Sequence, residues 1–206
     1  HLLHLLGVRY LSQDATLYPH LCPLALPEID VTFRPVMEQR TVYTWAMSTF
    51  GLHAMRSHQN MGGAKWPNGY APASYGVSVQ TASPPGSVHT SYTILGQNLT
   101  DARVPPHALW ESHREWFWPR SGGYGQLCWT NQSLLQFVAS QAIKYLRAQP
   151  HANLLDISQN DNGHYCNTTD EQRVIAAERS AIGPLLRAVN YVARAVRAEF
   201  PERDIV

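Results

Sequence analysis

The sequence predicts an α/β fold with a parallel sheet, and three observations in its last third lead there. Residues 131–147 have the apolar spacing of a helix, and residues 154–158 form a short apolar run of the kind buried in parallel sheets. A second long helix begins near Pro184. Alternation of helices with a buried strand implies parallel strands joined by crossover helices. A doubly wound sheet and a closed barrel both fit this alternation.

The composition is that of a globular domain. The chain has 206 residues, of which 44% are hydrophobic and 15% charged, which excludes a disordered chain. The net charge of +1 gives no indication of a nucleic-acid partner or of an anionic membrane. No apolar run approaches the roughly 18 residues that span a bilayer.

Residues 1–35 are predicted to be the end of a small N-terminal α/β domain and a linker. Residues 1–6 resemble the end of a helix, Gly7 stops it, and residues 8–11 follow as a short strand. Four prolines then punctuate the chain up to Pro35, as in an extended crossing between domains. Residues 36–206 are expected to form the second domain.

The middle of the chain contributes further strands. Residues 40–45 and 88–94 have strand composition, and residues 126–129 are predicted to be a short extended segment. The stretch over 58–88, rich in Gly, Ala, Ser and Pro, is typical of a functional loop or a disordered one. Near Trp110, two glutamates are interpreted as surface positions on a short helix: Glu111 and Glu115.

The two long helices carry clear local signals. Asn131 is a good N-cap for the first helix, and Pro150 ends it. Pro184 is a favoured first-turn residue of the second. The predicted apolar faces consist of Leu135, Val138, Ala142 and Leu146 in the first helix and of Leu185, Val189, Val192, Val196 and Phe200 in the second.

The cysteine pattern indicates neither a disulfide framework nor a zinc ribbon. Cys22, Cys128 and Cys166 lie far apart and form no Cys-x-x-Cys pair. His164 and Cys166 invite a thiol or metal interpretation, but no third ligand lies nearby in the sequence. We therefore expect no metal and no cofactor.

The cellular compartment stays open. The chain begins without Met or a basic region and stops where an apolar segment starts, so we expect both termini to be cuts, and a targeting signal could have been lost with them. Three Asn-x-Ser/Thr sequons, at Asn98, Asn131 and Asn167, would be used only in a secretory compartment.

Several stretches carry a family resemblance. The most specific are 126–131, which leads into the first helix, 157–162, which continues from the apolar strand, and 185–190 in the second helix. Together with residues 7–11, Arg40, Tyr43 and His89-Thr90, they resemble the bacterial family numbered domain of unknown function 4838 over nearly the whole chain. Its members look like relatives of alpha-glucuronidases and hexosaminidases and are regarded as candidate glycoside hydrolases.

The resemblance implies a partial (β/α)8 TIM-type barrel, truncated at its C-terminal side and preceded by the tail of a small α/β domain. A complete barrel needs about 250 residues, and this chain shows at most four β/α units. The family often carries a small cysteine cluster after the Gln-Asn-Asp-Asn run, of which only Cys166 remains here.

Asp161 is the candidate catalytic residue. It follows the strand over 154–158, and barrel enzymes hold their catalytic side chains at the carboxyl ends of strands. Asp161 would act as an acid or as a polarising carboxylate. The alternative is that residues 160–163 simply form a turn, in which the side chains bond to nearby backbone groups.

Glycoside hydrolysis normally needs two carboxyl groups, and a partner for Asp161 is hard to name. Related hexosaminidase-like enzymes keep an acidic pair at a comparable strand end, where this sequence has Asn160-Asp161. A substrate acetamido group could serve as the nucleophile instead.

Five residues are candidates for binding the sugar: Asn160, His89, Arg40, Trp66 and Trp129. Asn160 adjoins Asp161, the guanidinium fork of Arg40 suits hydroxyl or carboxylate groups, and the two tryptophans, from six in the chain, can stack on sugar rings. The alternatives are a structural histidine, a salt-bridged arginine and tryptophans that anchor the core.

The expected function is therefore that of a glycoside hydrolase acting on a uronide or an N-acetylhexosaminide by carboxylate acid/base chemistry. The alternatives are a non-catalytic carbohydrate-binding protein on the same scaffold and an inactive fragment. The expected partner is a carbohydrate, with neither nucleic acid nor membrane, and the oligomeric state stays open.

Overall fold

The computed structural model describes residues 2–12, 14–20, 28–30, 32, 36–37, 40, 53, 56–59, 81–101, 104–120, 123–152 and 154–201. The chain divides into two compact units, His1–Val79 and Gln80–Val206. Trp66, the expected strand over 40–45 apart from Arg40, and most of the expected loop over 58–88 lie outside the described residues. The predicted domain boundary after residue 35 stays a prediction.

The first unit begins with a helix end and a small hairpin. Helix α1 (Leu2–Leu5) ends at Gly7, whose φ of +87° is the left-handed conformation that suits glycine after a helix. Strands β1 (Arg9–Tyr10) and β2 (Thr16–Leu17) then pair antiparallel. A helix before Gly7, the stop at Gly7 and a short strand are confirmed, although the strand is shorter than 8–11.

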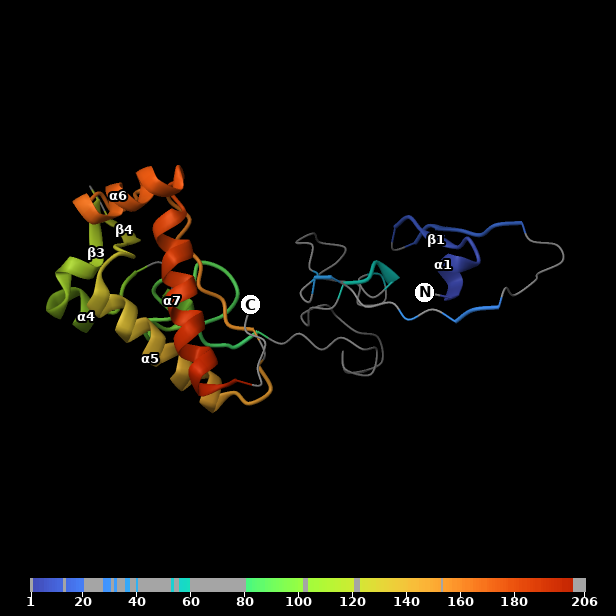
Figure 1. Cartoon of the computed structure of the whole chain (residues 1–206), viewed down its shortest axis with the longest axis horizontal. Coiled ribbons are helices and arrows are strands. Elements are labelled where there is room, and N and C mark those ends of the chain that lie inside the picture. Colours follow the sequence, from blue (N-terminus) through green and yellow to red (C-terminus); the bar gives the residue numbers. More distant parts are fainter. Residues whose placement is uncertain are drawn as a thin grey trace. The chain divides into compact units, whose positions relative to one another are not determined.

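The second unit is built on two long helices, α5 (Gln132–Ala148) and α7 (Gly183–Glu199), which lie side by side, with α6 (Thr169–Glu178) near one end (Figure 1). Both predicted helices are confirmed. The side chain of Asn131 caps α5 by accepting from the backbone N–H groups of Ser133 and Leu134, and Pro184 lies in the first turn of α7.

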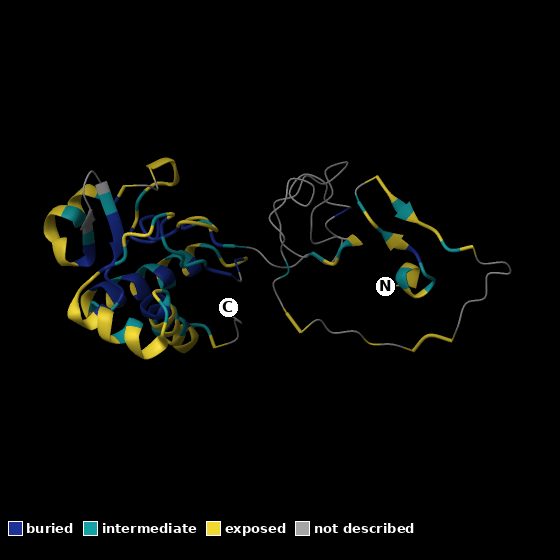
Figure 2. Cartoon of the chain, turned by 90° about the horizontal axis from the view of Figure 1, so that it is seen from above, coloured by how far each residue is buried: buried dark blue, intermediate teal, exposed yellow. Residues whose placement is uncertain are grey.

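The two helices bury their apolar faces in one core, and their exposed sides are yellow in Figure 2. The buried residues of these faces are Leu134, Leu135, Val138, Ala139, Ala142 and Leu146 on α5 and Leu185, Ala188, Val192 and Val196 on α7. Burial of each large aliphatic side chain stabilises the fold by about 1.5–3 kcal/mol, so this face accounts for the pairing of the helices.

A short helical region leads into a hairpin. After η3 (Leu99–Asp101) come α4 (His107–Ser112) and η4 (Arg114–Trp116), and the two expected surface glutamates, Glu111 and Glu115, are exposed on them. Strands β3 (Phe117–Arg120) and β4 (Gly123–Leu127) pair antiparallel, with Phe117 opposite Leu127. The expected extended segment over 126–129 is thus confirmed in part, as the end of β4.

The expected strand over 154–158 forms a single parallel bridge. Leu154 and Leu155 are buried, and Leu154 pairs with Thr81, where the Ala82 N–H donates to the Leu154 carbonyl at 2.8 Å. Across the described ranges the only sheets are the two antiparallel hairpins, β1–β2 and β3–β4, and no barrel is formed. The described fold is mixed α/β.

The predicted strand over 88–94 is wrong, because these residues form successive turns. Hydroxyl groups take part in the hydrogen bonds of Thr90 and Ser91 to the neighbouring segment: Thr90 Oγ1 donates to the Asp156 carbonyl at 3.0 Å, and Ser91 Oγ donates to the Ser158 carbonyl at 2.8 Å. Serine and threonine side chains can replace ladder partners in this way, so their strand-like composition misled the prediction.

None of the helices in the described ranges has both the length and the apolar character needed to cross a membrane.

Candidate functional site

A buried glutamine fixes the polar loop that contains Asp161. Gln126, near the end of β4, is 2% exposed. Its Nε2 donates to the carbonyls of Asn160 at 2.8 Å and of Asn162 at 2.7 Å, and its Oε1 accepts from the Asn160 N–H at 3.0 Å. Its own N–H donates to the His164 carbonyl at 2.9 Å. These hydrogen bonds hold the loop over 159–164 against β4.

Asp161 lies between the two residues that Gln126 binds. The Asn162 N–H donates to the Asn160 carbonyl at 2.8 Å, which places Asp161 at the centre of a three-residue turn. Asn162 Oδ1 accepts from the His164 N–H at 3.0 Å, so the turn interpretation is correct for this amide. Asp161 itself is exposed, and its carboxylate takes no hydrogen bond from the described part of the chain. The turn thus presents Asp161 to solvent on a fixed support.

Asn160 is buried beside this turn, with an exposed fraction of 7%. Both of its side-chain atoms, Oδ1 and Nδ2, are buried and lack a partner among the described residues. Leaving such a group unpaired costs about 1–3 kcal/mol, so we expect a partner outside the described residues, such as a water or a ligand. The carboxamide offers a donor and an acceptor side by side.

A second polar cluster lies on the same segment, where the turn of His89 and Thr90 meets Asp156 and Ser158. Ser158 Oγ donates to Asp156 Oδ1 at 2.6 Å, and Thr90 Oγ1 lies 3.2 Å from the same oxygen. The Ser158 N–H donates to Thr90 Oγ1 at 2.8 Å. Thr90 is fully buried and these bonds are partly buried, so they hold the Asp156 carboxyl group in place.

Burial raises the pKa of Asp156 above its usual value, because desolvation penalises the charged form. Hydrogen bonds from Ser158 and Thr90 and the nearby charge of His89 act in the opposite direction and are smaller. Burial therefore makes the Asp156 carboxyl group hold a proton more readily than an exposed aspartate does.

His89 precedes Thr90 in this cluster. It is exposed and has a φ of +54°, a left-handed conformation that is strained for a residue with a side chain. Its Nδ1 lies 3.3 Å from the Gln159 carbonyl. When Nδ1 carries the proton and donates it to this carbonyl, Nε2 is left as an acceptor for a ligand group.

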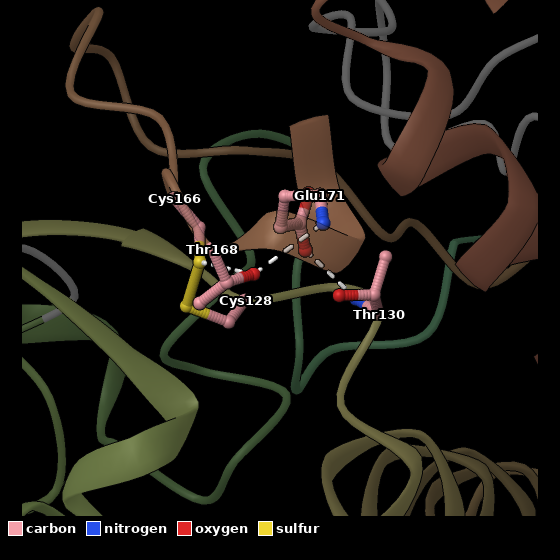
Figure 3. Close-up of a disulfide and its surroundings, with 5 residues drawn as sticks. All are labelled: Cys128, Thr130, Cys166, Thr168 and Glu171. Atoms are coloured by element: carbon pink, nitrogen blue, oxygen red, sulfur yellow. Dashed lines mark hydrogen bonds between the residues drawn. A yellow bond between two sulfur atoms is a disulfide. The ribbon is translucent and has the colours of Figure 1, made fainter. Parts of the chain in front are cut away.

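A disulfide closes the other side of the loop, between Cys128 and Cys166 (Figure 3). The spacing of the cysteines gave no support for a disulfide framework, and the structure forms one disulfide. The two residues are 38 positions apart, and their Cα atoms come within 5.2 Å because Gln126 and His164 already align the two segments. Cys166 is thereby also excluded as a free thiol nucleophile or metal ligand.

Glu171 connects helix α6 to the chain beside the disulfide, at Thr130. Thr168 caps α6 by accepting from the Glu171 N–H, and the Glu171 carboxylate accepts from the Thr130 N–H at 2.8 Å (Figure 3). Glu171 is 3% exposed, and burial raises the pKa of its carboxyl group, against the smaller opposing effect of hydrogen bonds from Thr130 and Trp129. The loop is thus fixed by Gln126, the disulfide and Glu171 together.

The remaining sugar-binding candidates are Trp129, Arg40 and Trp66. Trp129 is 5% exposed and belongs to the core, and its indole Nε1 has no partner among the described residues. Arg40 belongs to the unit His1–Val79, where its Nε donates to the His58 carbonyl at 2.8 Å and its Nη1 to the Met37 carbonyl at 2.6 Å. Trp66 lies outside the described residues. Of the predicted residues, the structure brings His89 against the segment that carries Asn160 and Asp161, through the Gln159 carbonyl.

Sequence reasoning missed the residues that support this segment: Thr90, Gln126, Asp156, Ser158 and Glu171. One signal was available, because Thr168-Thr169-Asp170-Glu171 has the Thr-x-x-Glu pattern of a helix start and would have marked α6. In the described ranges, no three His, Cys, Asp or Glu side chains come together as a set that could hold a metal ion.

Comparison with known proteins gives one match. The family model described as a domain of unknown function, DUF4838, matches residues 10–206. No curated protein and no solved structure matches the chain.

Proposed function

We propose that this chain, which belongs to the DUF4838 family, acts on carbohydrate as a glycoside hydrolase. The observation that carries the proposal is the bracketing of Asp161 by Gln126, which binds the backbone on both sides of it and leaves its carboxylate exposed. A catalytic group needs a rigid support in order to stay in its productive position. Asp161 would act as the acid or polarising carboxylate.

The finer fold assignment belongs to the same proposal. We place residues 154–158 as one strand of a partial (β/α)8 barrel, preceded by α5 and leading to the loop of Asp161. The parallel bridge between Leu154 and Thr81 supports this, because neighbouring barrel strands are parallel. In that arrangement Asp161 lies beyond the carboxyl end of its strand, where barrel enzymes hold their catalytic residues.

Asn160 and His89 would hold the substrate. The unpaired carboxamide of Asn160 suits a group with an adjacent donor and acceptor, such as two neighbouring sugar hydroxyls or an acetamido group. His89, fixed through Nδ1, would accept from a hydroxyl through Nε2. Both classes of substrate considered, uronides and N-acetylhexosaminides, carry such groups.

The test is turnover of a panel of aryl uronides and aryl N-acetylhexosaminides by the purified protein, with glycan binding measured on the same preparation. Release of the aryl group supports the hydrolase. If a cooperatively melting protein binds glycan but releases no aryl group, the proposed hydrolase is replaced by a non-catalytic carbohydrate-binding protein. That second function is favoured by the buried, unpaired amide of Asn160, which binding alone would satisfy.

A further inference from the structure

Asp156 occupies the point where the proposed strand passes from the core to the surface. Leu154 and Leu155 are buried, Asp156 is half-buried, and the loop of Asn160 and Asp161 follows on the same segment. The segment is held on one side by hydroxyls of the turn over 88–91 and on the other by Gln126. Both of its carboxyl groups therefore belong to one fixed stretch of backbone.

The hydrogen bonds of Asp156 fall on one oxygen. Ser158 Oγ donates to Oδ1 at 2.6 Å, and Thr90 Oγ1 lies 3.2 Å from Oδ1. Within the described part of the chain, no hydrogen bond reaches Oδ2. A proton on Oδ2 would leave the two hydroxyl contacts of Oδ1 in place, so Asp156 can hold a proton without disturbing its own support.

The surroundings of the two carboxyl groups differ. Asp156 is half-buried, and burial raises its pKa, whereas Asp161 is exposed to solvent. Two carboxyl groups in unlike environments are the usual basis for dividing the acid and base roles within one site. The half-buried group suits the acid, because burial favours its protonated form and its Oδ2 accepts no hydrogen bond from the described residues.

We propose that Asp156 is the second carboxyl group of the site and its general acid, an inference that rests on the proposed hydrolase function. As the bond between the anomeric carbon and the glycosidic oxygen breaks, its electron pair goes to that oxygen, which takes the proton from Asp156 Oδ2. A water adds to the anomeric carbon and gives a proton to Asp161, which in this assignment is the base, because Asp156 takes the acid role given above to Asp161. The hydrolysis consumes one water, and proton exchange with solvent restores both carboxyl groups.

The test compares substrates with good and poor leaving groups. A general acid matters when the leaving oxygen is basic and matters little when it is an acidic phenol. We expect Asp156→Asn to lower kcat/KM by about a hundredfold or more for alkyl glycosides, and by less than about tenfold for dinitrophenyl glycosides. Asp161→Asn should lower kcat/KM by a similar factor for both classes of substrate.

The matched control is Asp14→Asn. Asp14 is an exposed aspartate that accepts a hydrogen bond from a serine two positions away, Ser12 Oγ at 2.7 Å, as Asp156 does from Ser158. It lies in the unit His1–Val79, and its replacement should leave the ratio between the two substrate classes unchanged.

If Asp156→Asn lowers kcat/KM equally for alkyl and dinitrophenyl glycosides, Asp156 is a positioning residue and the inference is overturned. The proposed hydrolase function would still stand. Absence of turnover in the unmodified protein would overturn both. If Asp156→Asn fails to melt cooperatively, Asp156→Glu, which keeps the carboxyl group but displaces it, provides the second test. A steeper dependence on the leaving group would then support the acid role, and an unchanged dependence would overturn it.

Discussion

The side chain of Gln126 pairs with the backbone of Asn160 in both directions, accepting from its N–H at 3.0 Å and donating to its carbonyl at 2.8 Å. A side-chain amide is used here as a strand partner would be. Because Nε2 also reaches the Asn162 carbonyl at 2.7 Å, the residue between them, Asp161, is fixed on both sides. The position of the proposed catalytic carboxylate therefore depends on a residue of the β3–β4 hairpin.

The substitution Gln126→Glu should release this loop. It would keep the size of the side chain, but it would place a carboxylate against the carbonyls of Asn160 and Asn162. We expect the free energy of unfolding to fall by about 3 kcal/mol at neutral pH, because a buried donor is lost and a charge is buried. Urea unfolding measures the change, and Gln132→Glu on the exposed start of α5 should stay within about 0.5 kcal/mol of the unmodified protein. An equal effect of the two substitutions would contradict the role of Gln126.

Gly125 should tolerate no side chain. A Cβ there would lie 2.6 Å from the Trp118 carbonyl oxygen and 2.9 Å from that of His164, and both are backbone atoms. Gly125→Ala should lower the free energy of unfolding by about 1–3 kcal/mol or more, because the loop would be pushed away from β4. Gly163→Ala is the matched control within the same loop, since its added Cβ meets nothing within 4 Å. Similar melting temperatures for the two variants would contradict the close approach of the His164 carbonyl to Gly125.

The disulfide between Cys128 and Cys166 predicts one titratable thiol per unfolded chain. The sequence holds three cysteines, two of which are bonded to each other, so only Cys22 is left. Replacing both bonded cysteines by serine should lower the free energy of unfolding by about 2–4 kcal/mol, because the bond closes a long loop. Thiol titration in denaturant without reductant measures the count. Three reactive thiols would contradict the bond.

Glu171 should make stability fall as the pH rises. Burial raises the pKa of its carboxyl group in the folded protein above the ordinary value of 4.5, so the folded state binds the proton more tightly than the unfolded state. Its contribution to stability is fully present below the unfolded-state pKa and is lost as the pH rises through the folded-state pKa. Glu171→Gln keeps an oxygen for the Thr130 N–H and removes the titration.

Urea unfolding of both proteins between about pH 4 and pH 7 checks this, the range in which a carboxyl group with a raised pKa titrates. The stability of the unmodified protein relative to Glu171→Gln should decrease across the range. Glu178→Gln, at an exposed glutamate paired with Arg187, serves as the control for changing a glutamate of the same helix. A difference between wild type and Glu171→Gln that does not vary with pH, or that grows as the pH rises, would contradict the burial of this group.

Local signals explain what the sequence predicted well. Helices α5 and α7 follow from the capping side chain of Asn131, from Pro184 in a first turn and from apolar residues at helical spacing, all of which act within a few residues. The strand over 88–94 failed because Thr90 and Ser91 have strand composition and yet bond through their hydroxyls to residues almost 70 positions away.

Long-range pairing explains what the sequence left out. Nothing in the spacing of Cys128 and Cys166 determines that they meet, because their approach depends on the hairpin and on the loop that packs beside it. For Asp161, its place after the apolar run over 154–158 was visible in the sequence, but its support by Gln126 was not, since a buried glutamine has no local signature. Asp156 was overlooked because its hydroxyl partners include Thr90, from a segment predicted to be a strand.

The most direct test of the proposed function is the turnover of aryl uronides and aryl N-acetylhexosaminides by the protein and by its Asp161→Asn variant. Asp161 is exposed, so this substitution should leave the melting temperature unchanged. We predict that the unmodified protein hydrolyses one of the two classes and that the variant loses about a hundredfold or more in kcat/KM. Equal turnover by both proteins would contradict the role of Asp161, and absence of turnover in a cooperatively melting protein would contradict the hydrolase itself.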